Sequence, residues 1–431
     1  MRHRPLRLAL AAATLATPLL AACGDDDPPA NACDGVSGAC TVIAAGATGA
    51  ELQTAFIEAQ PGDTIGFTAG VYTIDRDLSL TVDRVTLRGT GTERAGGVVL
   101  SFAGSSGAEG ILITSDGTKV EHLAVEDTPG DAIKWEGADG VTVDDVRVEW
   151  TGAPRAENGS YGLYPVQCKN VLIENSAVRG ASDAGFYVGQ SDNIVVRNNL
   201  ARDNVAGIEI ENSTRADVYD NEATANTGGV LVFNLPGLQI KNGRGTRVYQ
   251  NNIHANNTTN FAPAGNIVAN VPAGTGIAMI AAHEIEIFDN DIVDHDSVNL
   301  AVVSYLITGN PINDPLYDPY SDSIHFHDNR VSGSSANPTG PLGFLLVMGM
   351  SEIMSAPIIV PDTIWDGLAD PMKVDGGGGA LMAAFKICLP DTNSMADFAN
   401  LNFPTGDATL PSRDAAPHRC AHPALPAVVL P

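Results

Sequence analysis

The chain has few basic and few aromatic residues. Its 431 residues contain 24 Lys and Arg against 51 Asp and Glu, so the formal net charge is −27, and only 6% of the residues are aromatic. A chain without a basic face cannot neutralise phosphate groups, which argues against nucleic acid as a partner. The same negative field repels polyuronates unless a divalent cation such as Ca²⁺ bridges carboxylates on both sides, so Ca²⁺ stays open as a cofactor.

Several motifs that identify enzymes and metal proteins are also missing. The sequence contains no Gly-Lys-Ser/Thr phosphate loop, no Gly-x-Ser-x-Gly nucleophile elbow and no Gly-Gly-x-Gly-x-Asp calcium repeat. Neither His-Glu-x-x-His nor a Cys/His zinc pattern occurs. His325 and His327 alternate onto one face, and His283 and His295 lie nearby along the chain, but no metal is identified by this pattern.

What recurs instead is a short apolar strand that ends at Asn or Asp and is followed by another strand. The clearest copies are VLIENSAV (171–178), IVVRNNLA (194–201), ADVYDNEA (216–223), IEIFDNDI (285–292) and IHFHDNRV (324–331). The residue after the acid or amide recurs at spacings of 23, 22, 30, 39 and 39, at Ser176, Asn199, Asn221, Asn251, Asn290 and Asn329. Such spacing indicates one structural unit stacked many times, with insertions in the later units.

A second signature is a small residue that opens an alternating strand. It occurs as GILIT, AIKWE, GLYPV, GFYVG, GIEIE, GVLVF, GIAMI and GFLLV, beginning at Gly110, Ala132, Gly162, Gly185, Gly207, Gly229, Gly276 and Gly343. Each repeat thus holds three short strands and has no room for a helix of ten residues. The sequence therefore predicts an all-β fold, a single-stranded right-handed parallel β-helix of about ten coils.

Stacked coils place equivalent side chains in columns. Alternation predicts an interior lined by Ile194, Val196, Ile208, Ile210, Val230, Val232, Ile277 and Met279. The recurrent Asn should bond to its neighbours in the coils above and below as a structural ladder. On the outside of the same strands, Asp217, Arg247, Glu286 and His325 should alternate in charge, while Arg197, Tyr219, Tyr249, Phe288 and His327 should stack.

The two ends of the chain differ from the repeats, and we divide the sequence into four segments. Residues 1–22 have the basic start and apolar stretch of a secretory signal. Residues 23–45 are a polar tether, residues 46–366 are the β-helix, and residues 367–431, in which the repeat fades, are a C-terminal cap. Ala50 to Gln60 is apolar at helical spacing and predicts a short helix that covers the open end of the first coil.

The cysteines indicate where the protein is located in the cell. Leu20-Ala21-Ala22-Cys23 resembles the lipobox of bacterial lipoproteins, which implies lipidation of Cys23, attachment to a membrane through that lipid and, with Gly24 next, an outer-membrane location in the cell envelope. An exported chain meets oxidising conditions. Proximity favours two disulfides, Cys33 with Cys40 and Cys388 with Cys420, and leaves Cys168 unpaired, although the sequence does not fix this connectivity.

The candidate site lies on the strands that open with Gly, because long insertions flank them. These insertions are Thr151–Ser160, Asn234–Gly245, His254–Thr275 and Leu306–Asp322. By alternation, the outward positions give catalytic candidates Lys134, Tyr164, Tyr187 and Glu209 in one column, and substrate-binding candidates Glu136 and Glu211 in the next, with Tyr161 beside them. We expect an exposed face that forms a groove for an extended polymer.

Three uses of this face are compatible with its residues. A Tyr or Lys would abstract the proton alpha to a uronate carboxylate, a second would protonate, and Glu209 or Glu211 would bind Ca²⁺. Alternatively, the rings stack on sugar faces without reaction. In a purely structural alternative, Lys134 pairs with a nearby Glu and the tyrosines pack under the loops.

The repeats carry a family resemblance. The stretches SYGLYPVQCKNVLIENSAVRGASDAGFYVGQSDNIVVRNN (160–199), NVAGIEIENSTRADVYDNEATANTGGVLVF (204–233) and NFAPAGNIVANVPAGTG (260–276) resemble exported bacterial parallel β-helix repeat proteins of unassigned activity, over roughly residues 46 to 400. More distantly, the chain is similar to the pectate lyase-like superfamily, whose lyases and mannuronan epimerases act at this strand face. The epimerase motif Asp-Pro-His-Asp is absent, and its nearest counterpart, residues 318–322, lacks the His.

Two functional hypotheses follow. In the first, the chain is a surface-anchored lipoprotein that binds extracellular or envelope polysaccharide; if it also cleaves, it is a polysaccharide lyase or related enzyme. In the second, it is a non-enzymatic envelope scaffold or protein-interaction module that docks a partner at the loop-framed face. An open polar groove favours the first hypothesis, and a face sealed by residues 254–275 favours the second.

Overall fold

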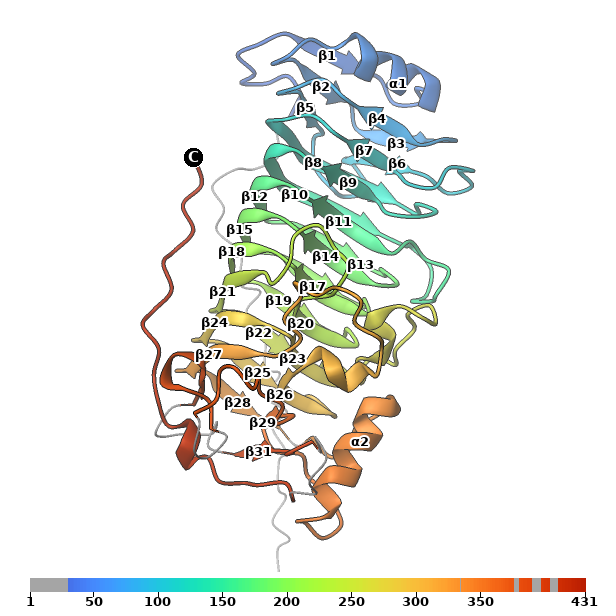
Figure 1. Cartoon of the computed structure of the whole chain (residues 1–431). Helices are drawn as coiled ribbons and strands as arrows, with labels where there is room; N and C mark the ends of the chain where they lie inside the picture. The colour runs from blue at the N-terminus through green and yellow to red at the C-terminus, as the bar shows by residue number, and fades with distance from the viewer. Residues whose placement is uncertain (1–29, 334, 376–379, 390–396, 404–409) are drawn as a thin grey trace, which may run out of the picture.

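The chain winds as a right-handed parallel β-helix with three walls of strands (Figure 1). The structure is a computed structural model that describes residues 30–333, 335–375, 380–389, 397–403 and 410–431. The predicted fold class is confirmed, because every pairing between the named strands is parallel and one wall contains 11 strands, close to the expected ten coils. The predicted signal segment, residues 1–22, and the predicted lipidation site Cys23 lie outside the described residues.

Each wall is defined by one of the three strand positions in the repeat. The Asn wall consists of β1 (Cys40–Ile43), β2 (Thr64–Phe67), β5 (Thr86–Arg88), β8 (Thr118–Glu126), β10 (Asp139–Glu149), β12 (Lys169–Glu174), β15 (Asp192–Arg197), β18 (Thr214–Tyr219), β21 (Arg244–Tyr249), β24 (His283–Phe288), β27 (Asp322–His327) and β30 (Ile387–Cys388). The short wall consists of β3 (Gly70–Thr73), β6 (Val98–Ser101), the ends of β8 and β10, β13 (Ala177–Arg179), β16 (Leu200–Arg202), β19 (Glu222–Thr224), β22 (Asn252–His254), β25 (Asp291–Val293) and β28 (Arg330–Ser332). The Gly wall consists of β4 (Leu78–Leu80), β7 (Ile111–Ile113), β9 (Ile133–Glu136), β11 (Tyr161–Val166), β14 (Ala184–Gly189), β17 (Ala206–Glu211), β20 (Gly228–Phe233), β23 (Thr275–Ile280), β26 (Val298–Val303), β29 (Thr363–Trp365) and β31 (Phe398–Asn400).

Strand pairing extends past both expected limits of the β-helix. β1 pairs with β2 before residue 46, and β30 and β31 add to the Asn and Gly walls after residue 366. The helices are α1 (Gly49–Glu58), α2 (Gly340–Ser351) and the 3-10 turns η1 (Ile267–Asn270), η2 (Tyr305–Thr308), η3 (Ala383–Phe385) and η5 (Ala416–His418). No helix in the described part of the chain is both long and apolar enough to cross a bilayer.

The interior is built as the alternation predicts. All eight predicted interior residues are at most 4% exposed and belong to one continuous apolar core. The Gly that opens the strands has a steric cause, because a Cβ at Gly207 would lie 2.6 Å from the carbonyl oxygen of Gly229 in the next coil. Gly207 therefore allows the two coils to stack closely at this corner.

The Asn ladder is also confirmed. The Nδ2 and backbone N–H of Asn199 both donate to Oδ1 of Asn221 at 3.0 Å, and the same pair of bonds joins each next Asn up to Asn329. The residue before each ladder position has a left-handed backbone, with φ of 55° at Asn198 and 53° at Asp220. Because Asn and Asp tolerate this conformation best after Gly, the sequence motif combines a turn residue and a ladder residue.

The outer columns of the Asn wall form as expected. The rings of Tyr219, Tyr249, Phe288 and His327 are stacked, with successive centroids 4.8, 4.8 and 5.0 Å apart. Arg247 lies between Asp217 and Glu286 in the charged column, at 3.5 and 4.0 Å. The large outer residues of this wall therefore contact one another from coil to coil and stabilise the stack.

The N-terminal cap is α1. Its first turn is held by a capping box between Thr48 and Glu51, and its buried residues Leu52 and Phe56 join the core.

One strand prediction is wrong, because GFLLV at Gly343 lies inside α2. A short apolar run fits a buried strand or a helix equally well, and here Pro341 in the first turn favours the helix.

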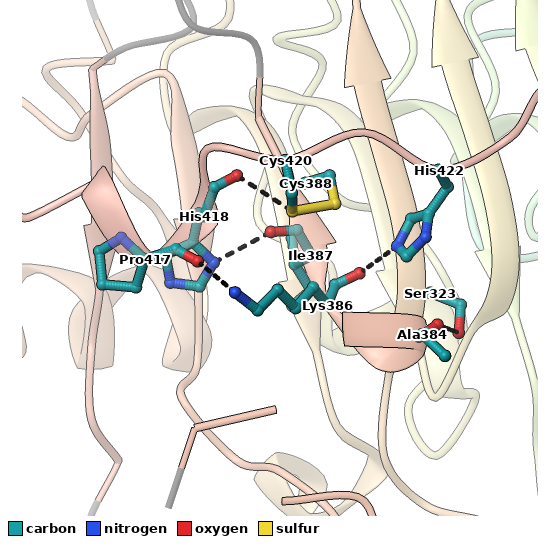
Figure 2. Close-up of a disulfide and its surroundings, with 9 residues drawn as sticks. All are labelled: Ser323, Ala384, Lys386, Ile387, Cys388, Pro417, His418, Cys420 and His422. Atoms are coloured by element: carbon teal, nitrogen blue, oxygen red, sulfur yellow. Dashed lines mark hydrogen bonds between the residues drawn. A yellow bond between two sulfur atoms is a disulfide. The ribbon is translucent and has the colours of Figure 1, made fainter. Parts of the chain in front are cut away.

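The C-terminal segment covers the other end and then returns along the Asn wall. The predicted disulfides are both formed, with Cα atoms 5.9 Å apart in Cys33–Cys40 and 4.9 Å apart in Cys388–Cys420, and Cys168 is free and buried. Figure 2 shows Cys388–Cys420 beside His418 and His422, which bond to the carbonyls of Ile387 and Lys386. The last residues, Pro423–Pro431, run along the outside of the coils (Figure 1), and we call them the strap.

Candidate functional site

The Gly wall places the predicted site residues in the expected columns. Tyr164 pairs with Lys134, and Tyr187 pairs with Glu209. In the next column, Val166 pairs with Glu136, and Gly189 pairs with Glu211. The structure thus brings all the predicted residues to one wall. It does not expose them equally, and the face divides into an open and a covered half.

The open half contains Lys134, Glu136 and the Tyr164 ring. The Lys134 Nζ lies 3.6 Å from carboxylate oxygens of both Glu109 and Glu136, and 5.4 Å from the centroid of the Tyr164 ring. The Lys134 side chain is 18% exposed, and that of Glu136 is 50% exposed. The pairing of Lys134 with nearby Glu is what the structural alternative expects, but the ammonium remains in reach of solvent beside an aromatic ring.

Three tyrosines meet where the halves join. The ring of Tyr161 lies 4.6 Å from that of Tyr164 and 4.4 Å from that of Tyr187, and Tyr164 meets Tyr187 edge to face at 4.9 Å. Burial raises the pKa of all three hydroxyls, well above the usual value for Tyr161 and Tyr187, and nearby carboxylates raise it further. These tyrosines are therefore protonated at neutral pH and do not offer the phenolate that proton abstraction needs.

The covered half corrects the expectation of an exposed groove. Tyr187 is 5% exposed, Glu209 1% and Glu211 7%. Tyr187 belongs to an apolar cluster that includes Val268 and Val271 of the 254–275 insertion. The insertion folds onto the wall because its apolar residues extend the cluster begun by the outward Leu, Phe and Ile of the later coils.

Beneath this cover lies a group of acids. The Tyr187 hydroxyl donates to Oε1 of Glu211 at 2.8 Å, and the Asn266 Nδ2 donates to Oδ2 of Asp183 at 2.8 Å. Burial, followed by repulsion between the carboxylates, raises the pKa of Asp183 and Glu211 to about 7, and raises that of Glu209 well above its usual value. Oε2 of Glu209 has no hydrogen-bond partner among the described residues. Glu209 is thus a carboxylic acid closed off from solvent.

Sequence reasoning missed two members of this group. Asp183 lies under the insertion, and Asp131 lies near Glu109, where burial raises its pKa to about 6. Both acids directly precede an Ala that opens or leads into a Gly-wall strand, two coils apart. That repeated Asp-Ala pair was the available signal.

Metal-ligating groups occur elsewhere. Within the described ranges, two groups bring three ligand atoms within 4.8 Å of one another: Glu286 with His325 and His327, and His283 with Asp318 and Asp322. Neither includes Glu209 or Glu211, so the Ca²⁺ role of these two residues stays a prediction without geometric support. In the second group the Lys373 Nζ lies 2.5 Å from an oxygen of each Asp and already supplies the positive charge.

The comparisons with known proteins agree with this architecture. Residues 79–235 match the family model described as right handed beta helix region. The chain is a right-handed parallel β-helix protein. This match agrees with the predicted β-helix and concerns the fold. A search of the curated proteins gives no match.

Solved structures with similar coils are distant. The A-modules of the Azotobacter vinelandii mannuronan C-5 epimerases AlgE4 and AlgE6 are 16% and 19% identical, with TM-scores of 0.42 and 0.43; the alignments cover 69% and 66% of this chain and 87% and 82% of theirs. An alginate lyase from Paenibacillus is 14% identical with a TM-score of 0.30, over 67% of this chain and 95% of that one. At these values the likeness carries no argument about function.

Proposed function

We propose that this β-helix binds polysaccharide through the open half of its Gly wall and does not cleave it. The observation that carries the proposal is the half-buried Tyr164 ring with the Lys134 ammonium beside it and the exposed Glu136 carboxylate next in the wall. An aromatic ring offers a surface for the apolar face of a sugar, the ammonium donates hydrogen bonds to hydroxyl oxygens, and the carboxylate accepts them from hydroxyl groups.

The charges around the patch favour a neutral polymer. Lys134 faces the carboxylates of Glu109 and Glu136, and Asp131 lies near Glu109, so acids outnumber the ammonium. A polyuronate would meet repulsion from this rim and from the net charge of −27. The raised pKa of the tyrosines and the closure of Glu209 support binding without cleavage.

Retention on immobilised polymers tests the proposal. The purified full chain in detergent is run through gels that contain neutral glucans, mannans or xylans, and through polyuronate gels with and without Ca²⁺, while unsaturated product is followed in solution. We expect retention by at least one neutral polymer, loss of about tenfold or more in affinity for Tyr164→Ala, and no product. The matched control is Tyr219→Ala, which removes a half-buried tyrosine from the Asn wall. Retention by none of the polymers, or equal retention of both variants, overturns the proposal.

A scaffold is the second candidate, and the cover on Glu209 and Glu211 favours it. The 254–275 insertion seals the later coils and presents its own surface in their place. If every polymer fails to retain the chain, the partner is a protein that docks on the loops. Formation of product from a polyuronate would contradict both candidates, because both deny that the tyrosines act as bases.

The location in the envelope is also proposed. Export is supported by the two disulfides, which form in oxidising compartments. Lipidation of Cys23 in the outer membrane is tested by labelling cells with a radioactive fatty acid. The label should follow the wild-type chain into the membrane fraction, and Cys23→Ser should remove both the label and the membrane association. A Cys23→Ser chain that remains in the membrane fraction contradicts lipid anchoring.

A further inference from the structure

A separate group of titratable side chains lies on the Asn wall, away from the tyrosine patch. Glu286 of β24 and His325 and His327 of β27 place their ligating atoms within 4.8 Å of one another. Glu286 pairs in register with His325, and His327 lies two residues further along on the same outward face. The stacking of adjacent coils therefore brings the three side chains together.

The separation of two of these ligands fits a small tetrahedral ion. Oε1 of Glu286 lies 3.3 Å from Nε2 of His327. Two ligands bound at about 2.0–2.2 Å to a tetrahedral Zn²⁺ lie about 3.3–3.5 Å apart. Nδ1 of His327 lies 2.8 Å from Oδ2 of Asp328, and this contact holds the ring with Nε2 turned toward Glu286. A carboxylate behind a histidine orients metal ligands in this way.

His325 supplies a nitrogen that the protein itself leaves without a bond. Its Nδ1 is buried and has no hydrogen-bond partner among the described residues, and its ring lies 4.5 Å from that of His327. A neutral imidazole nitrogen is the commonest protein ligand for transition metals. A buried polar atom without a partner costs free energy, which a bond to a cation would recover.

The charges beside the group leave an excess of negative charge. The Glu286 side chain is 5% exposed, and the Arg247 guanidinium lies between it and Asp217, at 4.0 and 3.5 Å. One guanidinium thus faces two buried carboxylates. The group at His283, Asp318 and Asp322 differs in this respect, because there the Lys373 ammonium contacts both acids directly.

We propose that Glu286, His325 and His327 bind a divalent transition-metal ion, with Zn²⁺ as the best fit. Two imidazole nitrogens and one carboxylate oxygen are ligands that Zn²⁺ accepts, whereas Ca²⁺ and Mg²⁺ prefer oxygen ligands alone. The fourth position of the tetrahedron is left to water. Arg247 lies on the far oxygen of Glu286 and does not occupy this position.

The site would fasten the strap to the coils. The backbone N–H of Leu425 donates to the second oxygen of Glu286 at 3.0 Å, and that of Val428 donates to Asp217 at 3.1 Å. His422, just before the strap, has its ring 6.2 Å from that of His325 and bonds to the Lys386 carbonyl (Figure 2). A metal that fixes Glu286 therefore also fixes the acceptor that holds the strap.

Metal titration of the full chain tests the site. The chain is treated with EDTA, desalted and titrated with ZnCl₂ by calorimetry, and with Co²⁺, whose visible absorption reports tetrahedral coordination. We expect one equivalent of each metal to bind, and His325→Ala and His327→Ala to weaken Zn²⁺ binding by at least about 100-fold. The matched control is His254→Ala, which removes a histidine that pairs with Glu222 on the short wall and should bind as the wild type does. If a histidine variant fails to fold, Glu286→Gln is tested in its place, because the Gln side chain keeps an acceptor for the Leu425 N–H.

Hydrogen exchange of the strap tests the role of the metal. Zn²⁺ should slow exchange at the amides of Leu425 and Val428 in the wild type and in His254→Ala, and should leave it unchanged in His325→Ala. Absence of stoichiometric binding, or equal affinity in the wild type and both histidine variants, overturns the site. Binding that does not slow exchange at these two amides overturns its role in holding the strap.

Discussion

Replacing one residue of the Asn ladder should destabilise the coils on either side of it. Asn221 makes four buried hydrogen bonds: its Nδ2 donates to the Val196 carbonyl at 2.9 Å and to Asn251 at 3.0 Å, and its Oδ1 accepts two bonds from Asn199 at 3.0 Å. In Asn221→Ala the backbone N–H of Asn199 loses the partner that the ladder gives it. At about 0.5–1.5 kcal/mol net for each bond, the four bonds contribute about 2–6 kcal/mol, and we expect a loss in the lower part of this range, about 3 kcal/mol.

The loss should be local, because each coil of a solenoid contacts its neighbours. We would measure urea unfolding of the full chain together with amide hydrogen exchange. A loss of about 3 kcal/mol corresponds to exchange about 100-fold faster in β15, β18 and β21, if exchange proceeds by opening of these coils. Strands near α1 should be unaffected.

The matched control is Glu222→Ala, one residue further along. Its carboxylate is 48% exposed and pairs with His254, and such surface pairs contribute about 0–1 kcal/mol. If Asn221→Ala costs no more than Glu222→Ala, the ladder does not stabilise the coils and this reasoning is refuted.

Two further predictions concern the acids and the C-terminal segment. Burial raises the pKa of Glu211 from 4.5 to about 7, so the folded chain holds a proton that the unfolded chain releases between these values, and this group lowers stability as pH rises through that window. Glu211→Gln should therefore gain stability over the wild type between pH 5 and pH 8 in urea titrations, and a difference that does not change with pH would contradict the burial of this acid. Replacing Cys388 and Cys420 together by Ser should destabilise the cap by about 3–4 kcal/mol, as expected for a cross-link over 32 residues, and should make the strap sensitive to limited proteolysis; unchanged cleavage would show that the strap is held without the disulfide.

The coil architecture could be predicted because the repeat carries its own geometry. A fixed spacing sets which residues stack, so the interior columns, the Tyr219 to His327 stack and the Asn ladder all followed from counting. A second ladder was missed, although Asn204, Asn226 and Asn256 follow the first one at the same spacing. Each Asn of the second ladder lies five residues after an Asn of the first, at the next corner of the coil. The predicted ladder included the first corner alone.

The burial of half the candidate face could not be predicted from spacing. Which residues an insertion covers depends on how its own apolar side chains pack, and this packing is not periodic. Val268 and Val271 belong to the cluster that buries Tyr187, while Tyr164, one coil earlier, is only half-buried against the edge of that cluster. The alternation placed Tyr187 and Glu209 outward and gave no information about what lies above them.

The central claim is that the Gly wall has an open half that can bind sugar and a closed half that cannot. Covalent footprinting of the folded full chain tests it most directly, with tyrosine and carboxyl reagents, first alone and then with the neutral polymer that retains it. We predict modification of Tyr164 and Glu136, protection of Tyr187 and Glu209 until the chain unfolds, and loss of Tyr164 labelling when the polymer is added. Equal labelling of Tyr187 and Tyr164 in the folded chain, or labelling of Tyr164 that the bound polymer leaves unchanged, would contradict it.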